Sequence, residues 1–221
     1  MLRLVIGNKN YSSWSLRAWL YLRESGIDFE EIQLHLDTEE FAEEVRRYTP
    51  AGRVPVLIDA DVTVWDSMAI LEHVREKFEG AVGWPAGPDA RAMARSIAAE
   101  MHSGFAALRD ELPQNLRAQT ALSRSGLSDA CRTDIARIES IWATSRSLHG
   151  AGGPWLFGPF SVADVVYAPV ALRFATYDVA LAGESRAFVD AICALPSVQE
   201  FIAAARAESA RIPAVDAHFS R

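Results

Sequence analysis

The hydrophobic pattern of this chain changes once, near residue 88, and that change restricts the fold more than any other feature. Before it, short β-rich runs alternate with segments of helical spacing, whereas the later residues show helical spacing without a convincing strand pattern. Strands separated by helices imply a crossover sheet with helical layers. We therefore expect an α/β domain over residues 1–80, a linker over 81–88 and an all-helical domain over 89–221.

The order of elements expected in the first 80 residues is βαβαββα. The first helix follows a polar loop, carries Trp14 and Tyr21 at helical spacing, and ends at Gly26, as expected of a glycine just past a helix C-terminus. The other expected elements are strands over Leu2–Gly7, Phe29–Leu36, Val54–Ile58 and Val62–Trp65, and helices over Glu39–Tyr48 and Ser67–Phe78.

Four helices are expected after the linker region, where residues 79–88 hold three glycines and two prolines. Apolar residues that step by three or four positions, Met101 and Phe105 among them, indicate one long helix over Ala90–Leu112. Ser161 and Asp164 form an S-x-x-D capping box before an apolar helix, which we interpret as structural. The remaining expected helices cover Ser128–Leu148, Ser161–Phe174 and Pro196–Ala207.

The charge and the cysteines argue against several classes of function. The formal net charge is -7, which disfavours nucleic acid or an anionic membrane as the main partner. No apolar run approaches the roughly 18 residues of a membrane span, and the N-terminal run is too short for a secretory signal, so we expect a cytoplasmic protein. Cys131 and Cys193 form no CxxC pair and no metal-ligand cluster, so we expect core thiols and no metal site.

Pro55 begins the third expected strand, where a missing N–H does least harm. In thioredoxin-like folds the proline at this point follows a cis peptide bond. That bond turns the N–H and C=O of the preceding residue, here Val54, outward to pair with a peptide-like ligand. The alternative is an ordinary trans proline in a turn.

Asp66 and Ser67 lie where the fourth expected strand ends and the third helix begins. A helix N-terminus presents free N–H groups and a partial positive charge, so Ser67 is suited to hold a carboxylate. The Asp66 carboxylate is suited to pair with an ammonium group. Together the two residues fit the α-amino acid end of a ligand, such as a γ-glutamyl group; the alternative is simple N-capping of the helix.

Serines gather between the first strand and the first helix, at Ser12, Ser13 and Ser15. One of them is needed as the N-cap of the helix, and this is the alternative to a catalytic role. Another hydroxyl can donate a hydrogen bond to a ligand thiolate. Because a free thiol has a pKa of about 8.5, such a donor at a helix N-terminus stabilises the reactive anion.

These motifs resemble, in order and spacing, those of the cytosolic glutathione transferases, and the resemblance covers essentially the whole chain. The nearest classes are the serine-type zeta and tau classes. A gapless alignment anchored at Gly26-Ile27 places Ser12 and Ser13 on the two serines of the zeta motif, and Ser12 on the tau serine. Trp14 stands where the zeta motif has a cysteine, which argues against zeta-type maleylacetoacetate isomerisation.

The resemblance implies a thioredoxin-like domain, a helical-bundle domain, and glutathione as co-substrate without a metal. Ser12, or Ser13 if the loop differs by one residue, would stabilise the glutathione thiolate. The thiolate would attack a hydrophobic electrophile or reduce a hydroperoxide. The residues implied in glutathione binding are Arg53, Val54, Pro55, Asp66 and Ser67, with Arg53 preferred over Lys9 for the glycyl carboxylate.

The electrophile site of this family lies between the domains, and its candidates here are Trp14, Met101 and Phe105, with His102 as a further possibility. Family members are usually homodimers. A glutathione-dependent isomerase and a non-catalytic interaction module are the alternatives that stay open. A glutathionyl reductase would need a nucleophilic cysteine near the first helix, and the first 130 residues contain none.

Overall fold

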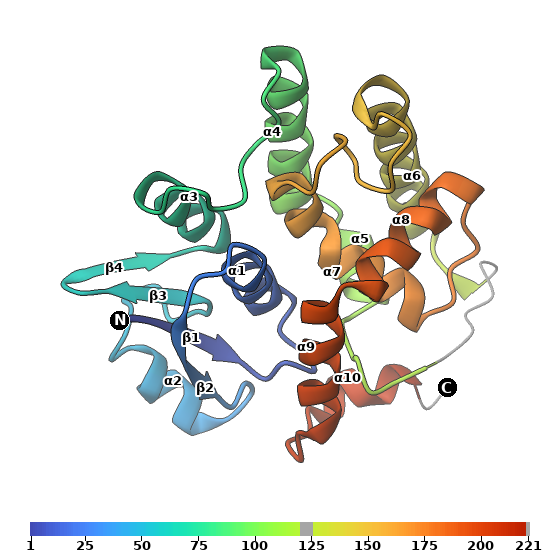
Figure 1. Ribbon diagram of the computed structural model, residues 1–221. Coiled ribbons are helices and arrows are strands. Elements are labelled where there is room, and N and C mark those ends of the chain that lie inside the picture. The colour runs from blue at the N-terminus through green and yellow to red at the C-terminus, as the bar shows by residue number, and fades with distance from the viewer. Residues whose placement is uncertain (120–125, 220–221) are drawn as a thin grey trace.

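The computed structural model describes residues 1–119 and 126–219. Its first part is a four-stranded sheet with strand order β2-β1-β3-β4 (Figure 1). β1 pairs in parallel with β2, and the β1–β3 and β3–β4 pairs are antiparallel. The expected βαβαββα order is confirmed. The strands are β1 (Leu2–Gly7), β2 (Phe29–Leu34), β3 (Val56–Asp59) and β4 (Val62–Trp65).

The sheet is covered by helices on both faces. Figure 1 shows α1 (Ser13–Glu24) and α3 (Ser67–Lys77) on one face and α2 (Glu39–Val45) on the other. The period of two along β1 explains this division, because successive side chains point to opposite faces. Leu4 and Ile6 are buried beneath α1 and α3, whereas Val5 belongs to the smaller cluster under α2.

The first helix has the ends that its sequence predicts. Ser12 is the N-cap, and its hydroxyl accepts a hydrogen bond from the N–H of Ser15. At the other end Gly26 has a left-handed φ of 64°, Gly26 N–H donates to Arg23 C=O, and Ile27 N–H donates to Leu22 C=O. This pair of bonds is the Schellman arrangement that favours glycine past a helix end.

The residues after Lys77 form a helical assembly. Residues 78–87 connect α3 to α4, and the regular elements described beyond them are helical apart from an isolated bridge between Trp155 and Gly158. The helices are α4 (Pro88–Ser103), α5 (Ala106–Glu111), α6 (Asp129–His149), α7 (Val162–Thr176), α8 (Gly183–Ala194), α9 (Pro196–Ala207) and α10 (Pro213–Asp216), with a 3₁₀ turn at Ala217–Phe219.

The single long helix expected over Ala90–Leu112 is wrong, because the chain breaks between α4 and α5. Gly104 is extended, with φ -107° and ψ -165°, and Phe105 is left-handed, with φ 60°. The Arg109 side chain donates to the carbonyls of Gly104 and Met101, which satisfies acceptors at the end of α4. The apolar spacing predicted a helix that continues through Gly104, whereas in the structure Gly104 is the C-cap at which α4 ends.

Three smaller differences concern element bounds. The third strand begins at Val56 instead of Val54, and the second strand and second helix end earlier than expected, at Leu34 and Val45. The α8 helix was not expected, although its buried residues Phe188, Val189 and Ile192 have helical spacing. The predicted ranges after residue 119 include positions 120–125 and 220–221, which lie outside the described residues.

One apolar core runs through both parts of the chain. It joins residues under α1 and α3 with residues of α4 to α9. α7 lies at its centre, buried on all sides from Val162 to Phe174, and packs against α1. The expected capping box is present at its start: Asp164 accepts from the N–H and hydroxyl of Ser161, each at 2.8 Å. The two halves are therefore held in a defined arrangement by shared apolar packing.

Within the described residues no single helix is long and apolar enough to cross a membrane, although α8 and α9 pass that test together, bent by 70°.

Candidate active site

Two neighbouring cavities lie where the edge of the sheet domain meets the helical part. Both are bordered by Trp14, Arg53 and Val54. The first has a volume of about 580 Å³ and is also lined by Ala51, Pro55, Trp65, Asp66, Ser67 and His102. The second, of about 430 Å³, is also lined by Tyr11, Ser12, Ser13, Leu36, Phe41, Gly52, Arg109, Pro113, Gln114, Arg173 and Val215. The two cavities thus bring together segments that are far apart in the sequence.

The backbone of Val54 is available to a ligand. The Val54–Pro55 peptide bond is cis, so the trans alternative is excluded. Val54 precedes β3 and takes no part in the sheet ladder. In the described part of the chain its N–H and C=O make no hydrogen bond. Val54 borders both cavities, and its N–H and C=O are suited to pair with a peptide backbone.

The start of α3 forms the end of the first cavity. Asp66 is the N-cap, with a left-handed φ of 76°, and its Oδ1 accepts from Met68 N–H at 2.8 Å. Capping therefore uses only one of the two carboxylate oxygens of Asp66. Ser67 is 1% exposed, and its hydroxyl has no hydrogen-bond partner among the described residues. A buried hydroxyl without a partner beside a cavity is suited to a polar ligand.

His102 reaches this end of the cavity from α4. Its Nε2 lies 3.1 Å from Asp66 Oδ2, and its ring contacts the Trp14 indole edge-on at 5.1 Å between centroids. The helical part therefore contributes directly to the wall around the start of α3. Asp66 is shared between its own helix and a residue from the opposite side of the cleft.

The hydroxyl of Ser12 is held within its own loop. Ser12 Oγ donates to Ser15 Oγ at 2.7 Å and accepts from Ser15 N–H at 3.3 Å. Ser15 Oγ in turn accepts from Gly7 N–H at 3.1 Å. This chain of bonds ties the end of β1 to the start of α1, so Ser12 has the capping role as well as a position on the second cavity.

Ser13, one residue further, faces a cation. Ser13 Oγ accepts a hydrogen bond from Arg173 Nη2 at 3.1 Å. Arg173 comes from α7 and is itself 5% exposed. Its Nε donates to the Leu112 carbonyl at 2.8 Å, and its Nη1 donates to the Pro169 carbonyl at 3.4 Å. The guanidinium is fixed from both sides, and it points one N–H at the serine.

Two more arginines surround Trp14. The guanidinium carbons of Arg17 and Arg109 each lie 4.6 Å from the indole centroid. Burial, and after it the charge of neighbouring guanidinium groups, lowers the pKa of Arg17 to about 9 and that of Arg173 to about 10. No carboxylate forms an ion pair with Arg17, Arg109 or Arg173 among the residues described. These three arginines, here called the arginine cluster, give the second cavity a positive field.

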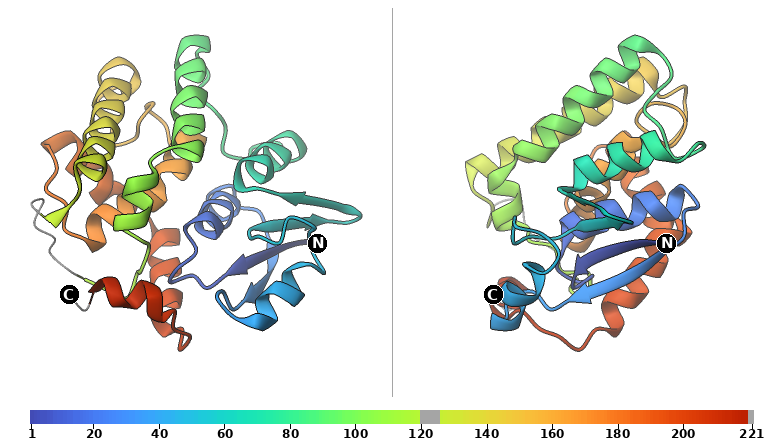
Figure 2. Two further views of the ribbon diagram at one scale, coloured as in Figure 1. Left: turned by 180° about the vertical axis from the view of Figure 1, so that it is seen from behind. Right: turned by 90° about the vertical axis from the view of Figure 1, so that its left-hand side faces the viewer.

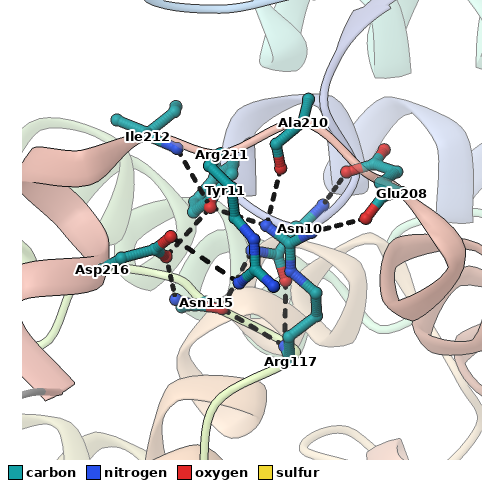
Figure 3. A network of polar contacts seen from close by, with 9 residues as sticks. All are labelled: Asn10, Tyr11, Asn115, Arg117, Glu208, Ala210, Arg211, Ile212 and Asp216. Carbon is teal, nitrogen blue, oxygen red and sulfur yellow. Dashed lines mark hydrogen bonds and ion pairs between the residues drawn. The ribbon is translucent and has the colours of Figure 1, made fainter.

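The loop before Ser12 is anchored by the end of the chain (Figure 3). The Glu208 carboxylate accepts from the N–H groups of Lys9 and Asn10 at 2.6 and 3.2 Å. Figure 3 shows the Tyr11 hydroxyl, which donates to Asp216 at 2.9 Å and accepts from Ile212 N–H at 3.1 Å. The Tyr11 hydroxyl also accepts from Arg117 Nη2. Val215, which lies between Ile212 and Asp216 in the same C-terminal segment, borders the second cavity.

The family follows from both halves of the chain. The model of the glutathione S-transferase N-terminal domain matches residues 11–77, and that of the C-terminal domain matches residues 69–204. The chain belongs to the glutathione S-transferase family. It is 31% identical over 162 residues to maleylacetoacetate isomerase of Rattus norvegicus, covering 71% of this chain and 70% of that protein.

Other relatives of this glutathione S-transferase family member match over a shorter range or in fold. It is 41% identical over 66 residues to dichloromethane dehalogenase of Methylorubrum extorquens, which is 29% of this chain. The chain spans about a quarter of the length of the two dichloromethane dehalogenases it matches. A maleylacetoacetate isomerase structure from Methylobacterium extorquens AM1, with bound malonate and glutathione, has a TM-score of 0.69, 23% identity, and coverage of 95% and 100% of the two chains.

Most of the residues expected at the glutathione S-transferase site lie together. The residues that border one or both cavities are Ser12, Ser13, Trp14, Arg53, Val54, Pro55, Asp66 and Ser67. Met101 and Phe105 do not border either cavity: they are 0% and 8% exposed and belong to the apolar core. Lys9 forms an ion pair with Glu31, so Arg53 is the better placed cation.

Sequence reasoning missed the arginine cluster and Val215. Arg109 and Arg173 lie on helices whose apolar spacing accounts for their neighbours, and a lone arginine in such a pattern indicates a solvent-facing position. The one available signal was the placement of Arg173 on the largely apolar helix α7. Among the described residues no group of three His, Cys, Asp or Glu side chains could hold a metal ion.

Proposed function

We propose that this chain binds glutathione in the first cavity and presents its thiolate to an electrophile in the second, as a glutathione transferase. The observation that carries the proposal is the buried Ser67 hydroxyl at the start of α3, on the same cavity as Val54; neither this hydroxyl nor the Val54 backbone has a hydrogen-bond partner among the described residues. The γ-glutamyl carboxylate would accept from Ser67 and from the helix N-terminus. Its ammonium group would pair with the Asp66 carboxylate, and Val54 would pair with the cysteinyl backbone.

In this proposal the sulfur would lie between the two cavities, next to Val54 and the serine loop, since both border the second cavity. Ser12 or Ser13 would donate a hydrogen bond to the thiolate, and no covalent bond to the protein is required. Arg53 is the candidate for the glycyl carboxylate. The electrophile would lie against the apolar groups of the second cavity, which include Leu36, Phe41, Pro113 and Val215. Met101 and Phe105 would support this wall from the core without touching the substrate.

The test of the glutathione site is calorimetric titration with reduced glutathione. Wild-type protein should bind one molecule per chain, and Ser67→Ala should lower the affinity about 10-fold or more, because a charge-assisted hydrogen bond of about 1.5–3 kcal/mol is lost. Ser96→Ala, on the exposed face of α4, is the matched control. Equal affinities for all three proteins would contradict our account of the γ-glutamyl site. No binding at all would favour a non-catalytic interaction module.

A glutathione-dependent isomerase is the second candidate, and the arginine cluster favours it. Guanidinium groups at the second cavity suit a substrate that carries a carboxylate. The rat relative is a maleylacetoacetate isomerase, and the Methylobacterium structure holds malonate with glutathione. The two candidates separate by product: a transferase consumes glutathione in a conjugate, whereas an isomerase leaves it unchanged. Assays with neutral and carboxylate-bearing electrophiles, following free glutathione, distinguish them.

The expected homodimer and the cytoplasmic location stay predictions. Their support is membership of the glutathione S-transferase family. The mass of the purified protein by light scattering tests the first, and subcellular fractionation tests the second.

A further inference from the structure

We infer that Arg173, acting through the Ser13 hydroxyl, positions and strengthens the hydrogen bond that stabilises the glutathione thiolate. The inference rests on the proposed function, since it concerns the sulfur of a bound glutathione. It assigns the donor role to Ser13 instead of Ser12 and adds a residue from α7 to the site. The observations that carry it are the different hydrogen bonds of two adjacent serines.

Ser12 is committed to the loop in which it lies. Its hydrogen is donated to Ser15 Oγ and its oxygen accepts from Ser15 N–H. A thiolate that took the Ser12 hydrogen would break the bond to Ser15 in the buried turn at the start of α1. The oxygen of Ser12 therefore serves as the N-cap, and its hydrogen is already held by Ser15 Oγ.

Ser13 has the opposite arrangement. Its oxygen accepts from Arg173 Nη2 at 3.1 Å, and its hydrogen has no acceptor among the described residues. A hydroxyl that accepts from a guanidinium is polarised, so it becomes a better hydrogen-bond donor. Ser13 is 8% exposed and borders the second cavity, as Val54 does. Because the bond from Arg173 occupies one side of the Ser13 oxygen, the hydroxyl hydrogen is left for an acceptor in the cavity.

Arg173 is built to hold this position. Three of its nitrogens donate, two of them to main-chain carbonyls, and the side chain is 5% exposed. A lysine at this position would have one point charge and no planar fork to satisfy the same three acceptors. Arg17 and Arg109 add positive charge beside the Trp14 ring, and in the described chain no carboxylate is paired with any of the three arginines. A positive field of this kind favours the thiolate over the thiol.

The step itself is a deprotonation. The S–H bond of glutathione breaks, its electron pair stays on sulfur, and the proton passes to solvent. Ser13 then donates its hydrogen bond to the anion, and Arg173 keeps its own proton throughout because its pKa of about 10 leaves it charged at neutral pH. Arg173 is thus a positioning residue, and Ser13 is the residue that contacts the sulfur.

The measurement is the ultraviolet absorbance of the thiolate in the complex with glutathione, titrated against pH. In wild-type protein the bound thiol should have a pKa well below its free value of about 8.5. Ser13→Ala and Arg173→Gln should each raise it by about 1 pH unit or more, as expected when a donor or a nearby charge is removed. Ser13→Thr keeps the hydroxyl and should restore the wild-type value, and Ser12→Ala should move it less than Ser13→Ala.

Binding of S-methylglutathione, which has no thiol, separates failure of this inference from failure of the proposed function. If wild-type protein does not bind it, the proposed glutathione site itself is wrong. Suppose that the wild type and Ser13→Ala bind S-methylglutathione equally, and that bound glutathione has the same thiol pKa in both proteins. The role inferred for Ser13 and Arg173 is then wrong. Because Arg173 is buried, Arg173→Gln could fail to fold; the comparison of Ser13→Ala with Ser13→Thr then tests the inference.

Discussion

Single residues in this protein carry charges whose surroundings determine their function. The three arginines of the arginine cluster are buried or half-buried, and none has a paired carboxylate within residues 1–119 and 126–219, an arrangement that costs solvation and is typical of functional sites. Asp59 shows the opposite situation. It lies at the end of β3 with Lys77 Nζ in contact and His73 Nε2 at 2.9 Å, both from α3. The arginines without a paired carboxylate are thus candidates for binding an anion, whereas the paired Asp59 carboxylate braces β3 against α3.

Asp59→Asn tests the brace. The hydrogen bond from Lys77, followed by that from His73, lowers the pKa of Asp59 below its ordinary value of 3.8. Because the pKa is lower in the folded state, the stabilisation is fully present above the ordinary value of 3.8. It is lost as the pH falls through the lowered pKa of the folded state. The variant should lose about 1 kcal/mol of unfolding free energy at pH 7 in urea titrations, and this loss should fade as the pH falls below 3.8 and through the lowered pKa of Asp59. Asp61→Asn, in the exposed turn, is the control, and an equal loss at all pH values would contradict the linkage.

Helices and strands decide where the site is open. The α4–α5 break turns the chain after Ser103, so α5 can bring Arg109 against Trp14. A continuous helix could not form the same bonds from Arg109 back to the carbonyls of Gly104 and Met101. The break is therefore part of how the second cavity is built, and Gly104 is the residue that permits it.

Gly104→Ala tests this element. A Cβ at position 104 would lie 2.8 Å from the Glu100 carbonyl oxygen, a backbone atom that cannot move aside cheaply. We expect a loss of about 1–3 kcal/mol of unfolding free energy, the range for an overpacked site. Gly83→Ala is the matched control, since a Cβ there meets nothing within 4 Å. Equal stability of both variants in denaturant titrations would show that the turn relaxes without strain.

At the scale of the whole molecule, the end of the chain returns to its beginning. Figure 2 shows α9 beside the sheet part, with the C-terminal segment beyond it, and α9 packs against α1. The residues from Glu208 to Asp216 bind the loop over residues 8–11 through the contacts in Figure 3. The loop that carries Ser12 is consequently held by parts of the chain about 200 positions away. Substrate-site geometry and the packing of the two halves are linked through this contact.

Tyr11→Phe tests the link. The change removes the donor to Asp216 and leaves the buried Ile212 N–H without its acceptor, so the unfolding free energy should fall by about 1–3 kcal/mol. Tyr48→Phe is the control, because the Tyr48 hydroxyl has no hydrogen-bond partner in the described part of the chain. Calorimetric melting curves compare the two. If Tyr11→Phe melts like the control, the hydroxyl network does not hold the C-terminal segment.

The sequence by itself determined the local features, because their causes are local. Four such features are each recognisable within a few neighbouring residues: the β-rich run of β1, the C-terminal glycine at Gly26, the capping box at Ser161 and the helix start at Asp66. The family motifs around Ser12, Pro55 and Ser67 are local in the same sense. For this reason the fold and most residues bordering the first cavity were predictable.

Only the tertiary structure decided what depends on residues far apart in the chain. The bond from Arg173 to Ser13 spans 160 positions, and the contacts of Glu208 with the first loop span 199 and 198. No periodicity encodes such a pair, so spacing placed Met101 and Phe105 as candidates for a cavity that they do not border. The choice between Ser12 and Ser13 likewise depends on hydrogen-bond partners, and one of those partners is brought in by a helix from the other half of the molecule.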